Sequence, residues 1–235
     1  MRRVRALAVV AVALCGCGSG GQSTVTVTKT AGGGAKPPSD GMTPRPEAVA
    51  KENGFQQVGK KAFYGVVLAN ESPTQSARGV RLTVHGVDAR GKVVGTDTQR
   101  FGAIPAQGQV GMGGELDLRS ARAVRELAIK VKTGSAGPAT ELLPRITKVR
   151  LVVERYGGIT VHAEVDNILD QTLSKPNDVF VVFRDGAGRI VGGTAAPPSQ
   201  DVPPGARAPI EVSVVDDVRD VVGVDVTVDN EGATG

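Results

Sequence analysis

The sequence predicts an all-β protein in which two tandem β-sandwich domains follow a signal peptide and a disordered tether. Three observations predict this class. Only 3% of the 235 residues are aromatic and none is tryptophan, whereas 32 glycines and 14 prolines punctuate short runs rich in valine and threonine. Such a composition favours β-branched strands joined by tight turns. Apolar residues alternate with polar ones, and the second half of the chain repeats the first at an offset of 97 positions.

The chain begins with the features of an export signal. Arg2, Arg3 and Arg5 give a positive start, and a short apolar run follows over residues 6–14. This run is too short to cross a membrane as a helix. Its end, Leu14-Cys15-Gly16-Cys17, resembles a bacterial lipobox, in which the chain is cut before the cysteine and the thiol carries a diacylglycerol.

Cys17 is the expected lipid attachment site, because small Gly16 precedes it whereas bulky Leu14 precedes Cys15. We therefore expect residues 1–16 to be removed as a signal peptide. The mature chain would then be anchored in the lipid bilayer, on the extracytoplasmic face of the cell membrane. The alternative is a plain secretory signal with an unanchored product.

The formal charge of +4 arises mostly at the start of the chain. Removal of residues 1–16 takes away three arginines and no acids, so that 28 Lys+Arg become 25 against 24 Asp+Glu. The mature chain, with a net charge of about +1, lacks the basic excess of nucleic-acid-binding proteins, and we expect no nucleic-acid partner. Both cysteines lie at the cleavage site, which leaves no thiol for a disulfide, a metal or a nucleophile.

Residues 17–50 have the composition of a flexible segment. They contain glycine clusters and several prolines, and they bury too little apolar surface to offset the entropy of ordering them. We interpret them as a tether with a mean reach of about 30 Å.

The rest of the chain is an internal duplication. It predicts a first sandwich over residues 51–134 and a second over residues 141–230, with a linker at residues 133–138. The matched segments are 64–70 with 161–167, 88–95 with 185–192, 104–105 with 202–203 after one residue of slippage, and 127–131 with 224–228.

Alternation and turn chemistry predict the strands within each copy. Val161, Ala163 and Val165 share one strand face while polar residues share the other, which is the pattern of a half-buried strand. Residues 88–92 and 185–189 both read Asp-x-x-Gly followed by Lys or Arg. The aspartate can bond the turn backbone and the glycine can adopt a positive φ, so we expect a hairpin at each place. Several short strands of this kind favour a β-sandwich.

The motif order in each copy resembles a known family. A strand that ends in Asn, a strand that ends in Asp-x-x-Gly-Lys/Arg, an apolar-apolar-Gly step and a Pro-containing turn follow one another. This order is similar to that of the FxLYD domain, an immunoglobulin-like module of bacterial lipoproteins and exported proteins. The resemblance covers about residues 55–132 and 150–229. It implies two immunoglobulin-like, extracytoplasmic sandwiches without enzymatic chemistry.

Two sets of residues suggest a ligand or metal site, but a structural role explains each of them better. Residues 86–92 match the Gly-x4-Gly-Lys core of a phosphate-binding loop, but Val93 follows where a Ser or Thr is needed, and the second copy keeps only the turn. His85 and His162 are the only histidines, at unrelated positions, and a metal site would need more ligands around them. We expect no catalytic residue, no metal site and no cofactor.

The acidic cluster Asp216, Asp217 and Asp220 is the remaining candidate, as a possible interaction loop. Its spacing matches no twelve-residue calcium loop. The corresponding part of the first copy carries arginines instead, so the loop is either solvated or used for docking between domains or molecules. The arginines are Arg119, Arg122 and Arg125.

These observations predict a membrane-anchored, non-enzymatic binding or interaction module of the cell envelope. Its partner would be an envelope protein or a cell-wall component. The alternative is a structural spacer without a specific ligand, and an enzyme is the weakest of the three hypotheses.

Overall fold

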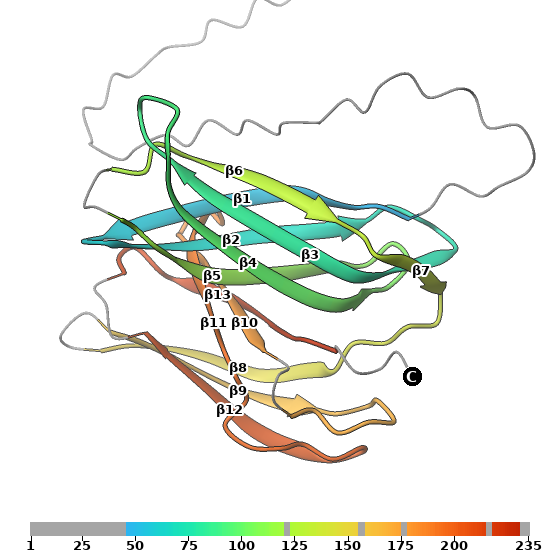
Figure 1. Cartoon of the computed structure of the whole chain (residues 1–235). Helices are drawn as coiled ribbons and strands as arrows, with labels where there is room; N and C mark the ends of the chain where they lie inside the picture. The colour runs from blue at the N-terminus through green and yellow to red at the C-terminus, as the bar shows by residue number, and fades with distance from the viewer. Residues whose placement is uncertain (1–45, 120–122, 155–157, 175–177, 215–217, 231–235) are drawn as a thin grey trace, which may run out of the picture.

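The computed structural model describes residues 46–119, 123–154, 158–174, 178–214 and 218–230. These residues form antiparallel strands without helices, so the predicted all-β class is confirmed (Figure 1). The described part therefore has no helix of the length and hydropathy that a membrane span requires. The strands of the first copy are β1 (Ala48–Val58), β2 (Lys61–Asn70), β3 (Gln75–Val87), β4 (Val93–Ile104), β5 (Gln109–Asp117), β6 (Glu126–Lys132) and β7 (Ser135–Pro138). Those of the second copy are β8 (Arg145–Val153), β9 (Ile159–Asp166), β10 (Val179–Arg184), β11 (Ile190–Ala196), β12 (Arg207–Val214) and β13 (Gly223–Val228).

Both copies have the same sheet topology. In the first copy the sheets are β1-β2-β5 and β4-β3-β6, with β7 added beside β3. In the second copy they are β8-β9-β12 and β11-β10-β13. Strands β1 to β6 thus correspond one by one to β8 to β13. The duplication seen in the sequence is a duplication of an immunoglobulin-like β-sandwich.

The two expected hairpins have the same geometry. In the first, Asp88 Oδ1 accepts from the backbone N–H groups of Arg90 and Lys92 at 2.9 and 3.0 Å. In the second, Asp185 Oδ1 accepts from the equivalent groups of Ala187 and Arg189, both at 2.9 Å. The glycines of the two turns have φ values of 75° and 77°, as expected. A side-chain hydrogen bond from Arg189 also lowers the pKa of Asp185.

A buried asparagine closes the same end of each sandwich. Asn70 is 1% exposed, and its Nδ2 donates to the carbonyls of Gln75, Ile104 and Pro105 at 2.8, 3.2 and 3.1 Å. Asn167 is fully buried, and its Nδ2 donates to the carbonyls of Gln171 and Val202 at 2.7 and 2.8 Å. Each amide therefore joins the end of one sheet to the Pro-containing turn that follows a strand of the other.

Two boundaries differ from those expected. Residues Ser135–Pro138, expected within the linker, form β7 and pair with β3 through residues 75–78. The pairing is possible because Gly79 has a φ of 58° and turns the strand beyond the point where β6 leaves it. Strand β1 begins at Ala48, inside the expected tether, since its first residues pair with the end of β2.

Candidate functional site

The candidate site is the buried contact between the two sandwiches. Sheet β1-β2-β5 of the first copy packs against sheet β11-β10-β13 of the second, so that four sheets lie in layers (Figure 1). The central strands β2 and β10 are buried on both faces. The two copies thus pack together as one body and are not two independent domains.

Side chains of the two central strands cross between the copies. Phe63 on β2 packs in the core of the second sandwich, and Phe180 on β10 packs in that of the first. The Phe180 ring lies 6.0 Å from the ring of Phe101, a tilted geometry that is favourable for aromatic pairs. Val67 and Val182 meet between the sheets, together with Ile190. Each sandwich therefore contributes apolar surface to the other's core.

Glycines allow the backbones of the two inner sheets to approach closely. A Cβ on Gly113 would lie 2.2 Å from the carbonyl oxygen of Val181 and 2.4 Å from the backbone nitrogen of Thr194. A Cβ on Gly54 would lie 1.9 Å from the carbonyl oxygen of Ile190, and one on Gly65 would lie 2.5 Å from that of Gly192. Backbone atoms cannot rotate away from a new methyl group, so only glycine fits these positions.

Polar groups fix the edges of this interface. Asp229 and Asn230, which follow β13, accept hydrogen bonds from the backbone N–H groups of Gly102 and Ala103 on β4, both at 2.8 Å. All four of these residues are buried. The edge of β4 is thereby satisfied by the second copy instead of being left open to another chain.

A salt bridge closes another edge of the interface. Arg184 on β10 donates to Glu52 on β1 at 2.8 Å and to Asp225 on β13 at 2.6 Å. The hydrogen bond to Glu52 is the main cause that raises the pKa of Arg184 above its ordinary value. The pair is partly exposed, so it contributes more to orientation than to stability.

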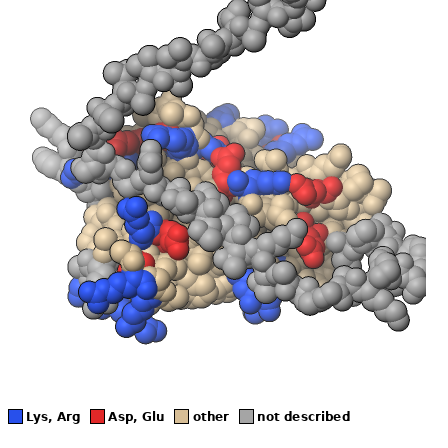
Figure 2. All heavy atoms as spheres, turned by 90° about the horizontal axis from the view of Figure 1, so that it is seen from above, with Lys and Arg blue, Asp and Glu red and all other residues tan. Residues whose placement is uncertain are grey.

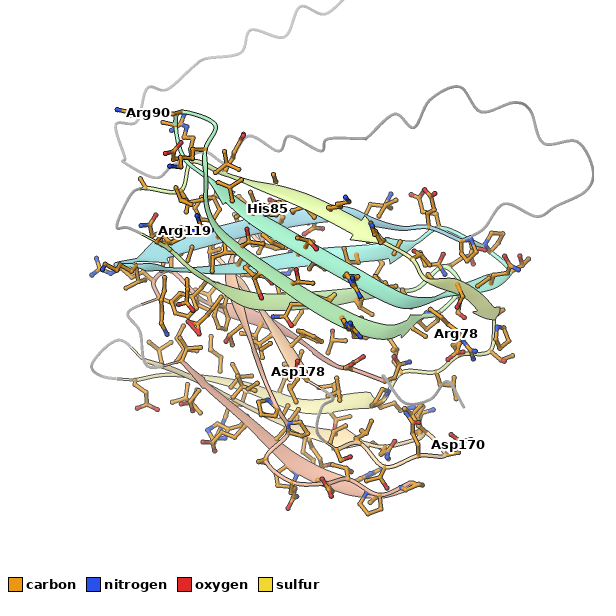
Figure 3. All side chains as sticks on the ribbon, in the orientation of Figure 1. Arg78, His85, Arg90, Arg119, Asp170 and Asp178 are labelled. Atoms are coloured by element: carbon orange, nitrogen blue, oxygen red, sulfur yellow. The ribbon has the colours of Figure 1, made fainter. Side chains whose placement is uncertain are left out.

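The structure describes only one of the site residues expected from the sequence, Asp220. Cys17, Asp216 and Asp217 fall outside the described residues, as does Arg122. Asp220 is exposed, with a φ of 60°. Arg119 and Arg125 are exposed at the corresponding place of the first copy. Figure 3 labels Arg119.

The loop that contains Asp220 nevertheless touches the first copy. Gln56 on β1 accepts from the backbone N–H of Arg219 at 2.6 Å, and its Nε2 donates to the carbonyl of Arg219 at 3.4 Å. An uncharged side chain of β1 makes this contact.

The histidines are not assembled into a site. His85 Nδ1 lies 2.8 Å from Thr96 Oγ1, and His162 Nδ1 lies 3.4 Å from Glu211 Oε2, on different copies. Within the described ranges, no three His, Cys, Asp or Glu side chains gather as metal ligands. The labelled ionisable residues in Figure 3 are likewise spread over both copies rather than converging.

Two hollows on the described surface lie beside segments that bear on the argument. One, of about 300 Å³, is lined by residues 88–90 and Ala123 beside the first hairpin. The other, of about 400 Å³, is lined by Pro46, Glu47 and Ala48 on one side and by residues 131–135 on the other. The second hollow marks where the chain enters the first sandwich, and Ala48 N donates there to Thr133 Oγ1 at 3.0 Å.

The sequence does contain a pattern that indicates the interface. It differs from the alternating pattern that predicts half-buried strands. Residues 62–69 and 179–183 are continuous apolar runs, in contrast to the alternation of β9 and β12. A short continuous apolar run indicates a strand that is buried on both faces. The central strands β2 and β10 both show this pattern.

Comparisons with known proteins give structural neighbours only. No protein-family model and no curated protein matches the sequence. Among solved structures, a red sea bream transglutaminase is 16% identical with a TM-score of 0.24, over 80% of this chain and 31% of that one. The exo-chitosanase CsxA of Amycolatopsis orientalis is 13% identical with a TM-score of 0.23, over 70% of this chain and 24% of that one. This chain spans less than a third of either protein, and similarities of this size do not bear on its function.

Proposed function

We propose that the chain is an extracytoplasmic lipoprotein, anchored to the cell membrane through acylated Cys17, whose two docked sandwiches act as one rigid, non-enzymatic interaction module. The observation that supports a module of this kind is the burial of β2 and β10 on both faces. A rigid body presents its outer faces in a fixed relation, and a preorganised surface loses little entropy when it binds. The partner would be another component of the envelope.

A structural spacer is the second proposal, and one observation favours it. Figure 2 shows basic groups beside acidic ones on the face that it presents, as on a surface that needs no ligand. A spacer requires only length and rigidity. Its function would survive exchange of the outer-face side chains, whereas that of an interaction module would not.

Replacing Cys17 with alanine should abolish incorporation of labelled fatty acid and leave the chain either unprocessed or released from the membrane. The physical reason is that only the thiol of the cysteine at the cleavage site can carry the lipid. Metabolic labelling with a fatty acid, followed by fractionation of cells, measures both effects.

Cys15→Ala is the matched control for this experiment. It removes the neighbouring cysteine two residues earlier and should leave labelling intact. Normal labelling of the Cys17→Ala chain would mean that the lipidation site lies elsewhere, and unlabelled wild-type chain would mean that the signal is purely secretory.

A further inference from the structure

The outer face of sheet β4-β3-β6 carries an unusual concentration of cations. Strand pairing places Arg100, Arg81 and Lys132 side by side in one row across the three strands. The next row is Thr98, Thr83 and Lys130. The third row contains Thr96, His85 and Ala128. We call the exposed side chains Arg81, Arg100, Lys130 and Lys132 the basic face.

No acidic side chain occupies these three rows. Within the described residues, none of the four cations of the basic face has an ion pair or a side-chain hydrogen bond, whereas Thr83 bonds Thr98 at 3.3 Å. Glu47 and Glu141 lie beside the face, and Glu141 is paired with Arg78. Like charges that are directly opposite on neighbouring strands destabilise a sheet. The basic face is therefore a feature that folding alone does not favour.

The outer face of the second copy provides the contrast. On sheet β12-β9-β8, Arg207 bonds Asp166 at 3.2 Å and Lys148 bonds Glu164 at 2.9 Å. Two of its exposed cations are thus paired with acids on the same sheet. The two faces belong to the outermost sheets of the four-layer stack (Figure 1). The unpaired cations of the first copy and the ion pairs of the second therefore lie on opposite sides of the molecule.

The basic face lies beside the point where the chain enters the fold. Lys132 and Ala48 line the same hollow, and Ala48 N is bonded to Thr133, the residue that follows Lys132. About thirty residues separate Cys17 from this point, and a segment of this length can span at most about 110 Å. A chain anchored at Cys17 would therefore hold the basic face within reach of the lipid headgroups.

We propose that the basic face binds the anionic phospholipid surface of the membrane that anchors the chain, a role that rests on the proposed lipoprotein function. The phosphates of the headgroups supply the counter-charges that these three rows lack. The threonine hydroxyls of the same rows are additional hydrogen-bond donors to phosphate oxygens. Contact through this face orients the stack, with the outer face of the second copy directed away from the bilayer.

The test uses the mature chain with Cys17→Ser, so that no lipid contributes to binding. Sedimentation measures its partition to vesicles of equal parts phosphatidylglycerol and phosphatidylcholine, and to vesicles of phosphatidylcholine alone. The test variant changes Arg81, Arg100, Lys130 and Lys132 together to glutamine. The control variant makes the same change at four exposed cations of the opposite face, Arg145, Lys148, Arg150 and Arg207.

Each basic side chain near an anionic surface strengthens binding by about fivefold. We expect the test variant to lose about a hundredfold or more in partition to the anionic vesicles and the control variant to lose about threefold or less. Binding by the wild-type chain should vanish on phosphatidylcholine, and near 1 M salt, where the Debye length is about 3 Å. The unfolding temperature of the test variant should stay equal or rise, because a repulsion has been removed.

Equal losses in the two variants would overturn the proposal, since net charge alone would then govern binding. Binding of the wild-type chain to soluble polyphosphate but not to anionic vesicles would overturn it too, in favour of an anionic polymer as the ligand. Fatty-acid labelling of the unmodified chain is scored separately. Failure of the basic face is thereby distinguished from failure of the lipoprotein function.

Discussion

Replacing Gly113 with alanine should lower the free energy of unfolding by about 2–3 kcal/mol, although it adds a single methyl group. The new Cβ would lie 2.2 Å from the carbonyl oxygen of Val181 and 2.5 Å from that of Thr194. Because these are backbone atoms of the facing sheet, either the two copies separate or both sheets distort. Denaturant unfolding of the mature chain measures the loss.

Gly186→Ala is the matched control for Gly113→Ala. Gly186 lies in the second hairpin, and no atom lies within 4 Å of a Cβ built there. Alanine there should leave stability unchanged or raise it by less than about 1 kcal/mol, since it restricts the unfolded chain. If the two variants proved equally stable, the close approach of the inner sheets would be refuted.

Replacing Asn70 with alanine should lower the free energy of unfolding by about 3 kcal/mol, and Asn167→Ala should have a similar effect on the second copy. Truncation leaves the buried Ile104 carbonyl without its amide donor, and a buried unsatisfied polar group costs about 1–3 kcal/mol. The backbone N–H of Ser72 would also lose its acceptor, Asn70 Oδ1, at 3.1 Å. Chemical denaturation measures both variants.

Asn53→Ala is the control for the asparagine variants. Asn53 is half-buried on β1 and makes no side-chain hydrogen bond within the described residues. Its truncation should change stability by about 0.5 kcal/mol or less. A comparably small loss at Asn70 would show that the amide does not join the two sheets.

Local sequence rules predict the inside of each sandwich well. The hairpins at Asp88 and Asp185 follow from turn chemistry that involves only five residues each. The equivalence of Asn70 and Asn167 follows from the repeat, and the one-residue slippage correctly matches the turn carbonyls of Ile104 and Val202 that they bind. Such features depend on neighbours in sequence or on the duplication itself.

The docking of the copies could not be predicted from those rules. The continuous apolar runs of β2 and β10 indicate burial on both faces, but they do not say that the second sandwich covers the face of β2 that carries Phe63. Gly113 fits its position only because a carbonyl from the distant strand β10 lies against it. The pairing of β7 with β3 likewise depends on where β6 ends. Local patterns can indicate that a strand is buried on both faces, but which surfaces meet depends on tertiary contacts.

The net charge of the chain does not predict the basic face, for a related reason. The mature chain is nearly neutral, yet strand register gathers three cations into one row of the first copy, whereas two cations of the opposite face are paired with acids. Only the fold determines which charges share a surface.

Calorimetry of the whole chain and of its two halves tests most directly whether the copies form one body. We predict a single transition for the mature chain, in which the calorimetric and van't Hoff enthalpies agree. Fragments 46–138 and 139–230 should each aggregate or unfold at a much lower temperature, because Phe63 and Val67 on one side and Val182 on the other lose their cover. Two separate transitions in the whole chain, at the unfolding temperatures of the isolated halves, would contradict the account.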